Sequence, residues 1–194
     1  MIIQATPYGT KKEEPFAFTY SGDFTDERVD GIGDVTLNTS GTLVTTGQTV
    51  KVQVYILAGG GGGAYNDIYS NQAYYGTGGG GGYQTVEIEL TPGTYEITIG
   101  TGGAGKKAAA NSVKASNGGD TVAFGYTSTG GGGGNASTVG SGGTGGTPNG
   151  GAGTYIKGGA QNQTIKGGNP NGGSATNNAS KNKGGDGLVR ITFS

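Results

Sequence analysis

The residue types and spacings that could support chemistry are clearest in GTGGAGKK, at residues 100–107. Gly100, Gly105 and Lys106 fit the phosphate-binding pattern G-x-x-x-x-G-K and follow a strand-like segment. However, Lys107 stands where a Ser or Thr hydroxyl would contact Mg²⁺, and no later apolar strand ends in a suitable Asp. The stretch also fits G-x-G-x-x-G, but no βαβ unit surrounds it, and a chain with 47 Gly produces such matches by chance. We interpret it as a glycine-rich connection and expect no nucleotide or other cofactor.

Few side chains are suited to acid–base or metal chemistry. The chain has no Cys and no His, which excludes disulfides, thiolate ligands and imidazole bases. Asp120 and Asp186 each follow a Gly pair, and we expect them to accept hydrogen bonds from backbone N–H groups of neighbouring segments. Two isolated carboxylates are too few for calcium, which takes roughly 6–8 oxygen ligands. We therefore predict that the protein is not an enzyme and holds no metal.

A second group of candidate residues lies between two Gly blocks, in AYNDIYSNQAYYGT at residues 64–77. Tyr presents an apolar ring and a hydroxyl and loses little rotamer entropy on binding, which suits a recognition surface. The amide side chains beside the Tyr residues suit sugar hydroxyls. The alternative is that the rings cover the edge of a sheet. The candidate receptor-binding residues are Tyr65, Asn66, Tyr69, Tyr74 and Tyr75.

The segments that would position these residues are strands. Apolar and polar residues alternate in 49–57, 83–90 and 94–99, and Pro92-Gly93 between the last two suits a tight turn. We therefore predict a hairpin over 83–99. Further strand candidates are 15–20, 34–37 and 187–193. The best helical candidate, 106–116, contains helix formers but no apolar face that could dock on a core.

The glycine-rich part cannot fold around an ordinary core. Residues 100–187 contain only six of the large aliphatic or Phe side chains: Val113, Val122, Phe124, Val139, Ile156 and Ile165. One alternative is a flexible low-complexity segment. The other is packing of backbone against backbone, in extended helices with three residues per turn that bond to their neighbours. The return of the chain to a strand at 187–193 favours order, because a tail would not need to come back.

The resulting expectation is an all-β fold in which antiparallel strands and a hairpin bracket a glycine-rich, polyglycine-II-like sandwich. In such packing a side chain at Gly132 should be costly, whereas Ser137, expected in an exposed loop, should tolerate Val. We divide the chain into a β lead-in at 1–48, a candidate for virion attachment, and a glycine-rich domain at 49–194.

Charge is unevenly distributed although the net charge is only −1. Residues 100–187 carry seven Lys and two Asp, and the remainder is acidic. The basic part could meet an anionic surface polymer, or the Lys residues could serve solubility. We expect no nucleic-acid partner. No apolar run is long enough to span a membrane, and the N-terminus lacks the order of a signal peptide, so we expect no membrane insertion and synthesis in the cytoplasm.

The order of motifs resembles the glycine-rich domain of bacteriophage tail fibres and tail-tip adhesins over roughly residues 49–194. The motifs are VYILAGGGGG, GGGGGYQ before a strand, TPGTYEITIGTGGAG, GGDTVAFG, a third Gly block and a closing GGDGLVRITF. In that family, stacked polyglycine-II helices carry variable loops that determine host range. Residues 1–48 depart from any recognisable attachment domain.

The resemblance implies a virion protein, assembled in the cytoplasm of the host bacterium, that binds a receptor through loops between Gly motifs. The implied partners are host surface polysaccharide or outer-surface protein and other virion fibre proteins, with a homo-oligomer, a trimer favoured, or a mounting on a trimeric fibre. Two alternatives stay open. The first is a structural virion component, such as a capsid decoration or head-fibre protein, without a specific ligand. The second is a non-viral bacterial surface, matrix or ice-binding protein, although irregular Gly spacing disfavours ice binding.

Overall fold

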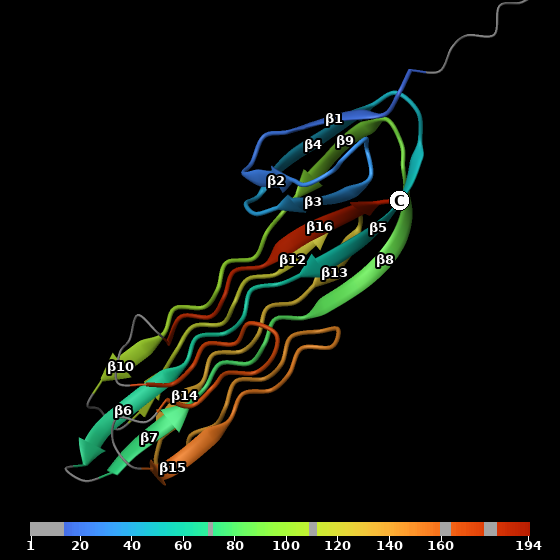
Figure 1. Cartoon of the computed structure of the whole chain (residues 1–194). Helices are drawn as coiled ribbons and strands as arrows, with labels where there is room; N and C mark the ends of the chain where they lie inside the picture. Colours follow the sequence, from blue (N-terminus) through green and yellow to red (C-terminus); the bar gives the residue numbers. More distant parts are fainter. Residues whose placement is uncertain (1–13, 70–71, 109–111, 160–163, 177–181) are drawn as a thin grey trace, which may run out of the picture.

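The computed structural model describes residues 14–69, 72–108, 112–159, 164–176 and 182–194, and these contain strands but no α-helix. Two sheets form a β-sandwich at one end of an elongated molecule (Figure 1). One has the order β2-β3-β16-β5-β8 and the other β1-β4-β9, with antiparallel neighbours throughout. The strands are β1 (Ala17–Tyr20), β2 (Phe24–Asp26), β3 (Gly33–Leu37), β4 (Gly41–Thr46), β5 (Val50–Leu57), β8 (Tyr83–Leu90), β9 (Gly93–Ile97) and β16 (Leu188–Phe193).

Alternating side chains of the two sheets build the main hydrophobic core, as the sequence pattern predicted for 49–57. Val54 and Ile56 of β5 are fully buried, and Val189 and Ile191 of β16 lie beside them. The strand that ends the chain is therefore the central strand of the larger sheet. β3 and β4, which precede residue 48, lie within the same two sheets, so strands from both sides of that position share one core.

The predicted hairpin over 83–99 is wrong, although both strands exist. β8 pairs with β5 in the larger sheet, and β9 pairs with β4 in the smaller one. The turn at Pro92 therefore carries the chain across the sandwich. Leu90 and Ile97 consequently belong to one core from opposite sheets. The alternating pattern identified two strands and a turn, but it contains no information on which earlier strand pairs with each.

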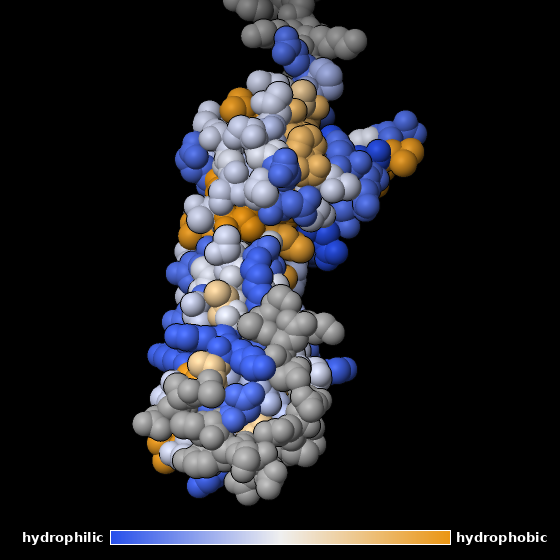
Figure 2. Space-filling model, turned by 90° about the vertical axis from the view of Figure 1, so that its left-hand side faces the viewer, coloured by the Kyte–Doolittle hydropathy of each residue, from blue (hydrophilic) through white to orange (hydrophobic). Residues whose placement is uncertain are grey.

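Extended glycine-rich segments run side by side from the sandwich to the opposite end of the molecule (Figure 1). We call them the glycine bundle, residues 58–63, 77–82, 100–105, 115–120, 129–134, 142–147, 150–154, 167–174 and 182–187. The packing of backbone against backbone predicted from the sequence is confirmed, and the flexible alternative is wrong. In Figure 2 the visible surface between the two ends is pale to blue, because few large apolar side chains are present there.

Hydrogen bonds show how the bundle is organised. Along residues 58–63, successive backbone N–H groups donate in turn to residues 79–82, 116–119 and 182–185, and the order then repeats. This repeat of three is the signature of a helix with three residues per turn. Carbonyl groups of the same segment accept bonds from three further segments, residues 103–106, 131–134 and 171–173. Residues 58–63 are thus surrounded on all sides by neighbouring backbone.

The position of a segment in the bundle explains its glycine pattern. Residues 59–63 and 78–82 are entirely buried and consist of Gly alone. Residues 77–82 donate to three neighbours in the same repeating order as 58–63 do. Segments at the surface instead read Gly-Gly-x, and the third residue, such as Ala104 or Thr144, is exposed. The two Gly runs at 59–63 and 78–82 therefore mark the centre of the bundle, and spaced Gly pairs mark its periphery. The third run, at 130–134, is only partly buried, and the N–H groups of Gly130 and Gly133 donate to the side chains of Asp120 and Asn117.

Short strands close the end opposite the sandwich, which we call the hairpin end (Figure 1). They are β6 (Ala64–Tyr69), β7 (Gln72–Gly76), β10 (Lys106–Ala108), β11 (Ser112–Lys114), β14 (Asn135–Ser137) and β15 (Tyr155–Gly159). The described residues of 106–116 form no helix, as the lack of an apolar face indicated, because β10 and β11 occupy 106–108 and 112–114. Ser137 is misplaced by the sequence prediction, because its side chain in β14 is only 5% exposed.

Candidate binding surface at the hairpin end

The hairpin end gathers strands that are far apart in the sequence. β6 and β7 form an antiparallel hairpin at the centre of a four-stranded sheet, with β10 and β15 at its edges. β11 and β14 form a separate pair that packs against β6 and β7. Each strand continues directly from a segment of the glycine bundle. The bundle therefore fixes the spacing of this end through backbone hydrogen bonds, and not through a large apolar core.

The structure brings the predicted Tyr residues together but buries them. Tyr65 is 2% exposed, Tyr74 5% and Tyr75 0%. The rings of Tyr65 and Tyr75 pack edge to face with centroids 5.2 Å apart, on one face of the β6–β7 hairpin. Tyr74 lies on the other face, against Val113 of β11. The segment is thus a pair of central strands between two small cores, and its rings do not cover the edge of the sheet.

The other two predicted site residues also belong to β6. Asn66 is 1% exposed, and its side-chain amide donates to the carbonyl oxygen of Ala136 at 3.3 Å. Tyr69 ends β6, where its backbone pairs with Gln72, but its side chain lies outside the described residues. Direct contact with a receptor by these residues stays a prediction. Their burial means that a partner would first meet the surface that they support.

The exposed charged side chains among the described residues of this end are basic. Lys106 and Lys107 lie on β10, Lys114 on β11 and Lys157 on β15, and all four are exposed. Lys107 lies 3.8 Å from the carboxylate of Asp67 and 5.6 Å from the ring centre of Tyr65. The other three form no ion pair within the described part of the chain. The hairpin end therefore presents positive charge that its own carboxylates do not balance.

Burial and nearby charge also set the acidity of Tyr65. Burial is the main cause that raises the pKa of its hydroxyl, and the charge of Asp67 adds to the effect. The phenol consequently stays neutral throughout the physiological range. The Tyr65 hydroxyl is a hydrogen-bonding group in this environment, and its ring provides packing for the Lys107 ammonium.

The residues that resembled a phosphate loop have another task in the fold. The N–H of Gly100 donates to the Thr121 hydroxyl at 2.9 Å, and the N–H of Gly103 donates to the Gly60 carbonyl at 2.8 Å. No helix follows, because Lys106 begins β10. With these N–H groups bound to neighbouring segments, residues 100–106 are part of the glycine bundle, as the interpretation of a glycine-rich connection anticipated.

The prediction for the two Asp residues is confirmed. Asp120 accepts a hydrogen bond from the N–H of Gly130 at 2.8 Å, and Asp186 accepts one from Gly102 at 2.6 Å. The bond from Gly102 is the main cause that lowers the pKa of Asp186, with a further contribution from Lys183. Asn117 and Asn171 have the same function toward Gly133 and Gly81. These side chains bind N–H groups that face no backbone carbonyl.

Two negative findings apply to the residues that the structure describes. The described ranges contain no helix that is long and apolar enough to cross a membrane. Within the same ranges, no three carboxylates are grouped in a way that could hold a metal ion.

The fold defines a class of protein in which a β-sandwich and a small hairpin end are joined by a bundle of glycine-rich helices. The family described as the glycine-rich domain matches residues 36–194 of the 194. The chain therefore belongs to the glycine-rich domain family. A comparison with curated proteins finds no match.

Sequence reasoning missed two features of this surface. It identified the Tyr-rich segment but not its strands, although a high density of Tyr favours a strand as much as a loop. It also did not place the Lys residues together, because they come from three strands that pair across long sequence distances. The clearest available signal was the concentration of Lys in the part of the chain that contains few apolar residues.

Proposed function

We propose that this protein is a bacteriophage adhesin, part of a tail fibre or tail tip, that binds a receptor on the host cell surface. The hairpin end is the binding surface in this proposal, and the β-sandwich end faces the rest of the virion. The observation that carries it is the combination of a glycine-rich bundle, held by hydrogen bonds between backbones, with exposed, unbalanced Lys residues at its end. The sequence resemblance to phage adhesins supports the same function.

The architecture suits recognition for a physical reason. The bundle is stabilised by bonds between backbones, so the residues that connect its segments at the hairpin end can change without a loss of those bonds. Binding residues commonly lie on connections that a rigid scaffold positions. β1 and the C-terminal residue Ser194 both lie at the sandwich end, which leaves the hairpin end free to face outward (Figure 1).

The charge of the hairpin end points to the type of receptor. Lys106, Lys114 and Lys157 would attract an anionic surface polysaccharide, or an acidic region of an outer-surface protein, over a distance of about one Debye length, ~8 Å at physiological salt. Neighbouring virion proteins, including further copies of this chain in a trimer, would hold several such surfaces together and raise the avidity.

Adsorption of the purified, fluorescently labelled protein to a panel of bacterial strains tests this proposal. We expect that Lys106→Glu, Lys114→Glu and Lys157→Glu together weaken adsorption by about tenfold, at roughly 0.5 kcal/mol per exposed charge. Lys51→Glu is the matched control, because it makes the same change at the sandwich end. If the triple variant adsorbs as the parent does, the Lys residues are not part of the binding surface.

The second candidate is a structural virion component without a specific ligand. The concealed aromatic rings of Tyr65, Tyr74 and Tyr75 favour it, since they offer no exposed aromatic surface for recognition. Labelling of virus particles with gold-conjugated antibody against this chain separates the two functions. Gold on the capsid, together with no adsorption to any strain of the panel, would favour the structural component.

A further inference from the structure

A pocket of about 430 Å³ opens at the edge of the β-sandwich, far from the hairpin end. Its walls are residues 88–89 of the edge strand β8, residues 94–96 of β9, and residues 124–126. Phe124 and Gly125 connect β12 (Thr121–Ala123) with β13 (Tyr126–Ser128), an antiparallel pair. Three separate parts of the chain thus meet at this pocket.

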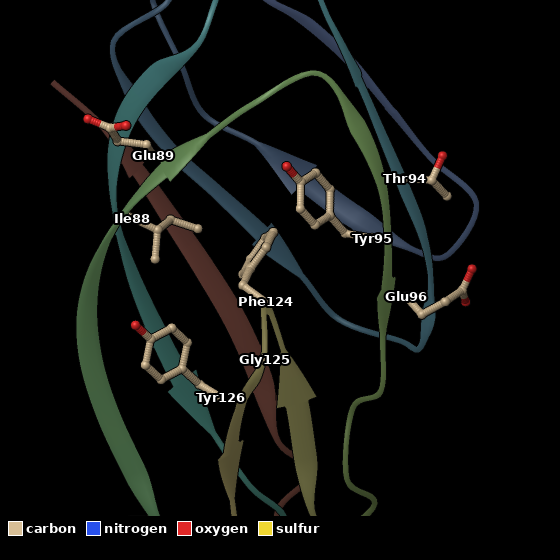
Figure 3. A pocket seen from close by; sticks show the side chains of 8 residues that line it. All are labelled: Ile88, Glu89, Thr94, Tyr95, Glu96, Phe124, Gly125 and Tyr126. Atoms are coloured by element: carbon tan, nitrogen blue, oxygen red, sulfur yellow. The ribbon is translucent and has the colours of Figure 1, made fainter.

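Aromatic rings form the inner surface of the pocket. Figure 3 shows Tyr95, Phe124 and Tyr126 around its centre, together with Ile88. Tyr95 and Phe124 pack edge to face with centroids 5.4 Å apart. The Tyr126 side chain is 38% exposed, and its hydroxyl has no hydrogen-bond partner within the described ranges. The ring of Tyr126 is therefore available for contact with a second molecule.

The backbone holds Phe124 in place. Phe124 has a φ of 52° and Gly125 a φ of 81°, which is the geometry of a two-residue type I′ turn. A bulky residue rarely adopts a left-handed conformation. The tight turn keeps the ring of Phe124 directed toward Tyr95 and gives the pocket a fixed wall.

The electrostatic environment of the pocket is negative. Glu89 and Glu96 lie on opposite sides of the opening, with carboxylates directed outward, so they act at the entrance and not at the floor (Figure 3). No basic residue lines the pocket. Lys51 is the cross-strand neighbour of Glu89, but the two form no ion pair within the described residues. Residues 14–58, 83–99 and 188–194 together carry nine carboxylates against three basic side chains.

Elsewhere in the same molecule, cations occupy comparable arrangements of rings and carboxylates. Arg28 lies 4.8 Å from the ring centres of both Phe18 and Phe193 and pairs with Asp26 at 2.7 Å. Arg190 lies 5.5 Å from the ring of Tyr55 and 3.8 Å from Asp34, and Lys107 has the arrangement with Tyr65 and Asp67 described above. The pocket of Tyr95, Phe124 and Tyr126 has the rings and the acidic surroundings, but no cation of the described chain fills it.

We infer that this pocket is a binding site for a cationic side chain, Arg or Lys, of a second polypeptide. The planar guanidinium of Arg stacks on aromatic faces and is more weakly hydrated than an ammonium, so Arg fits the three rings better than Lys does. The partner meets the sandwich end with a basic residue, and the two Glu residues favour its approach. This site is independent of receptor binding at the hairpin end.

Titration of the isotope-labelled protein with N-acetyl-arginine amide, followed by amide NMR signals, tests this inference. We expect the largest shifts at residues 94–96 and 124–126, and weaker shifts in 0.5 M salt. N-acetyl-glutamine amide is the matched uncharged probe, and we expect its affinity to be about twofold to fivefold lower, since a cation–π contact at an exposed site contributes roughly 0.5–1 kcal/mol. Equal affinity for both probes, or no shift at these residues, would overturn the inference.

Substitutions identify the groups that bind the probe. Tyr126→Ala should lower the affinity for the arginine probe by about twofold to fivefold, and Glu89→Gln should lower it by about twofold. Val122→Ala on the same β-hairpin and Glu87→Gln on the same face of β8 are the controls, because neither residue lines the pocket. Control variants that lose as much affinity as the pocket variants would contradict the assignment. Mapping on the parent protein decides the question even if Tyr126→Ala does not fold.

Discussion

The β-sandwich and the glycine bundle are stabilised in opposite ways. In the sandwich, side chains such as Ile56 fill the space between two sheets, and burial of their apolar surface is the main favourable contribution. In the bundle, the inner Gly positions lie so close to neighbouring backbone that a side chain there would clash, and hydrogen bonds between backbones replace a large apolar core. The sandwich loses stability when atoms are removed from a buried side chain, and the bundle loses stability when a side chain is added at an inner Gly.

The largest effect is therefore expected from a single methyl group at the centre of the bundle. A Cβ at Gly61 would lie 1.9 Å from the carbonyl oxygen of Gly132, which is a backbone atom that cannot rotate away. Gly61→Ala must push two segments apart and disturb bonds to several neighbours. We expect a loss of more than about 4 kcal/mol in the free energy of unfolding, measured by urea denaturation, or a failure to fold.

The matched control is Gly93→Ala in β9. There a Cβ would meet only the ring of Tyr95, at 3.7 Å, which is an ordinary contact. We expect a change within about 1 kcal/mol, and a small gain is consistent with the reduced freedom of the unfolded chain. A side chain at Gly132 should have a cost between these two, because its Cβ would first meet the Thr144 hydroxyl, at 2.6 Å. If Gly61→Ala and Gly93→Ala melt at the same temperature, the bundle is not close-packed.

The second largest effect is expected in the sandwich, from a substitution that removes atoms instead of adding them. Ile56 is fully buried in the central part of the larger sheet. Ile56→Ala should cost about 2–5 kcal/mol, because the removed methyl groups leave a cavity that the surrounding strands fill only partly. Val44→Ala, at a position 38% exposed, should cost much less. Thermal unfolding of both variants measures the difference.

Much of this contrast could be predicted from the sequence, since alternation in 49–57 and the lack of large side chains in 100–187 identify the two types of packing. The strands could be located because each has its own pattern of apolar residues. Their partners could not, because pairs such as β9 with β4 depend on the whole chain. A turn sequence such as Pro92-Gly93 is the same whether it joins neighbours in a sheet or crosses between sheets.

The candidate site was harder to predict than the fold. The Tyr-rich segment at 64–77 has no strong alternation, and the same rings suit a binding loop or a small core. What decides between them is the position of Val113, Ala136 and Ala175, which come from distant parts of the chain and cover the rings. The role of the Asp residues after Gly pairs was easier to predict, because an acceptor next to two small residues has neighbouring N–H groups within reach.

A moderate effect is expected where a side chain completes the hydrogen bonding of the bundle. Asp186→Ala removes the acceptor of the Gly102 N–H, and we expect a loss of about 1 kcal/mol, since the carboxylate is partly exposed. Because the native pKa of Asp186 is lowered, its carboxylate stabilises the fold above its ordinary pKa, and this contribution disappears as the pH falls through the native value.

Denaturation of the parent and of Asp186→Ala as a function of pH measures this contribution. The difference in unfolding free energy should be constant near neutral pH and decrease below about pH 4. Asp186→Asn keeps an oxygen acceptor and removes the charge, so it should lose less than the Ala variant at pH 7. A difference that grows as the pH falls would contradict the sign of the shift.

The smallest effect is expected at the third position of a surface Gly-Gly-x repeat. Ala104 is exposed, while a Cβ at the preceding Gly103 would lie 2.1 Å from the carbonyl oxygen of Ser116. Ala104→Lys should therefore change the unfolding free energy by no more than about 0.5 kcal/mol, as is usual for surface substitutions, whereas Gly103→Ala should unfold the protein or nearly so. The unfolding free energies lost by substitution at two adjacent residues would then differ by several kcal/mol. No difference in helix or strand propensity can produce a difference of that size. If Ala104→Lys were as damaging as Gly103→Ala, all positions of the surface segments would be packed, and the repeat of three would not describe the bundle.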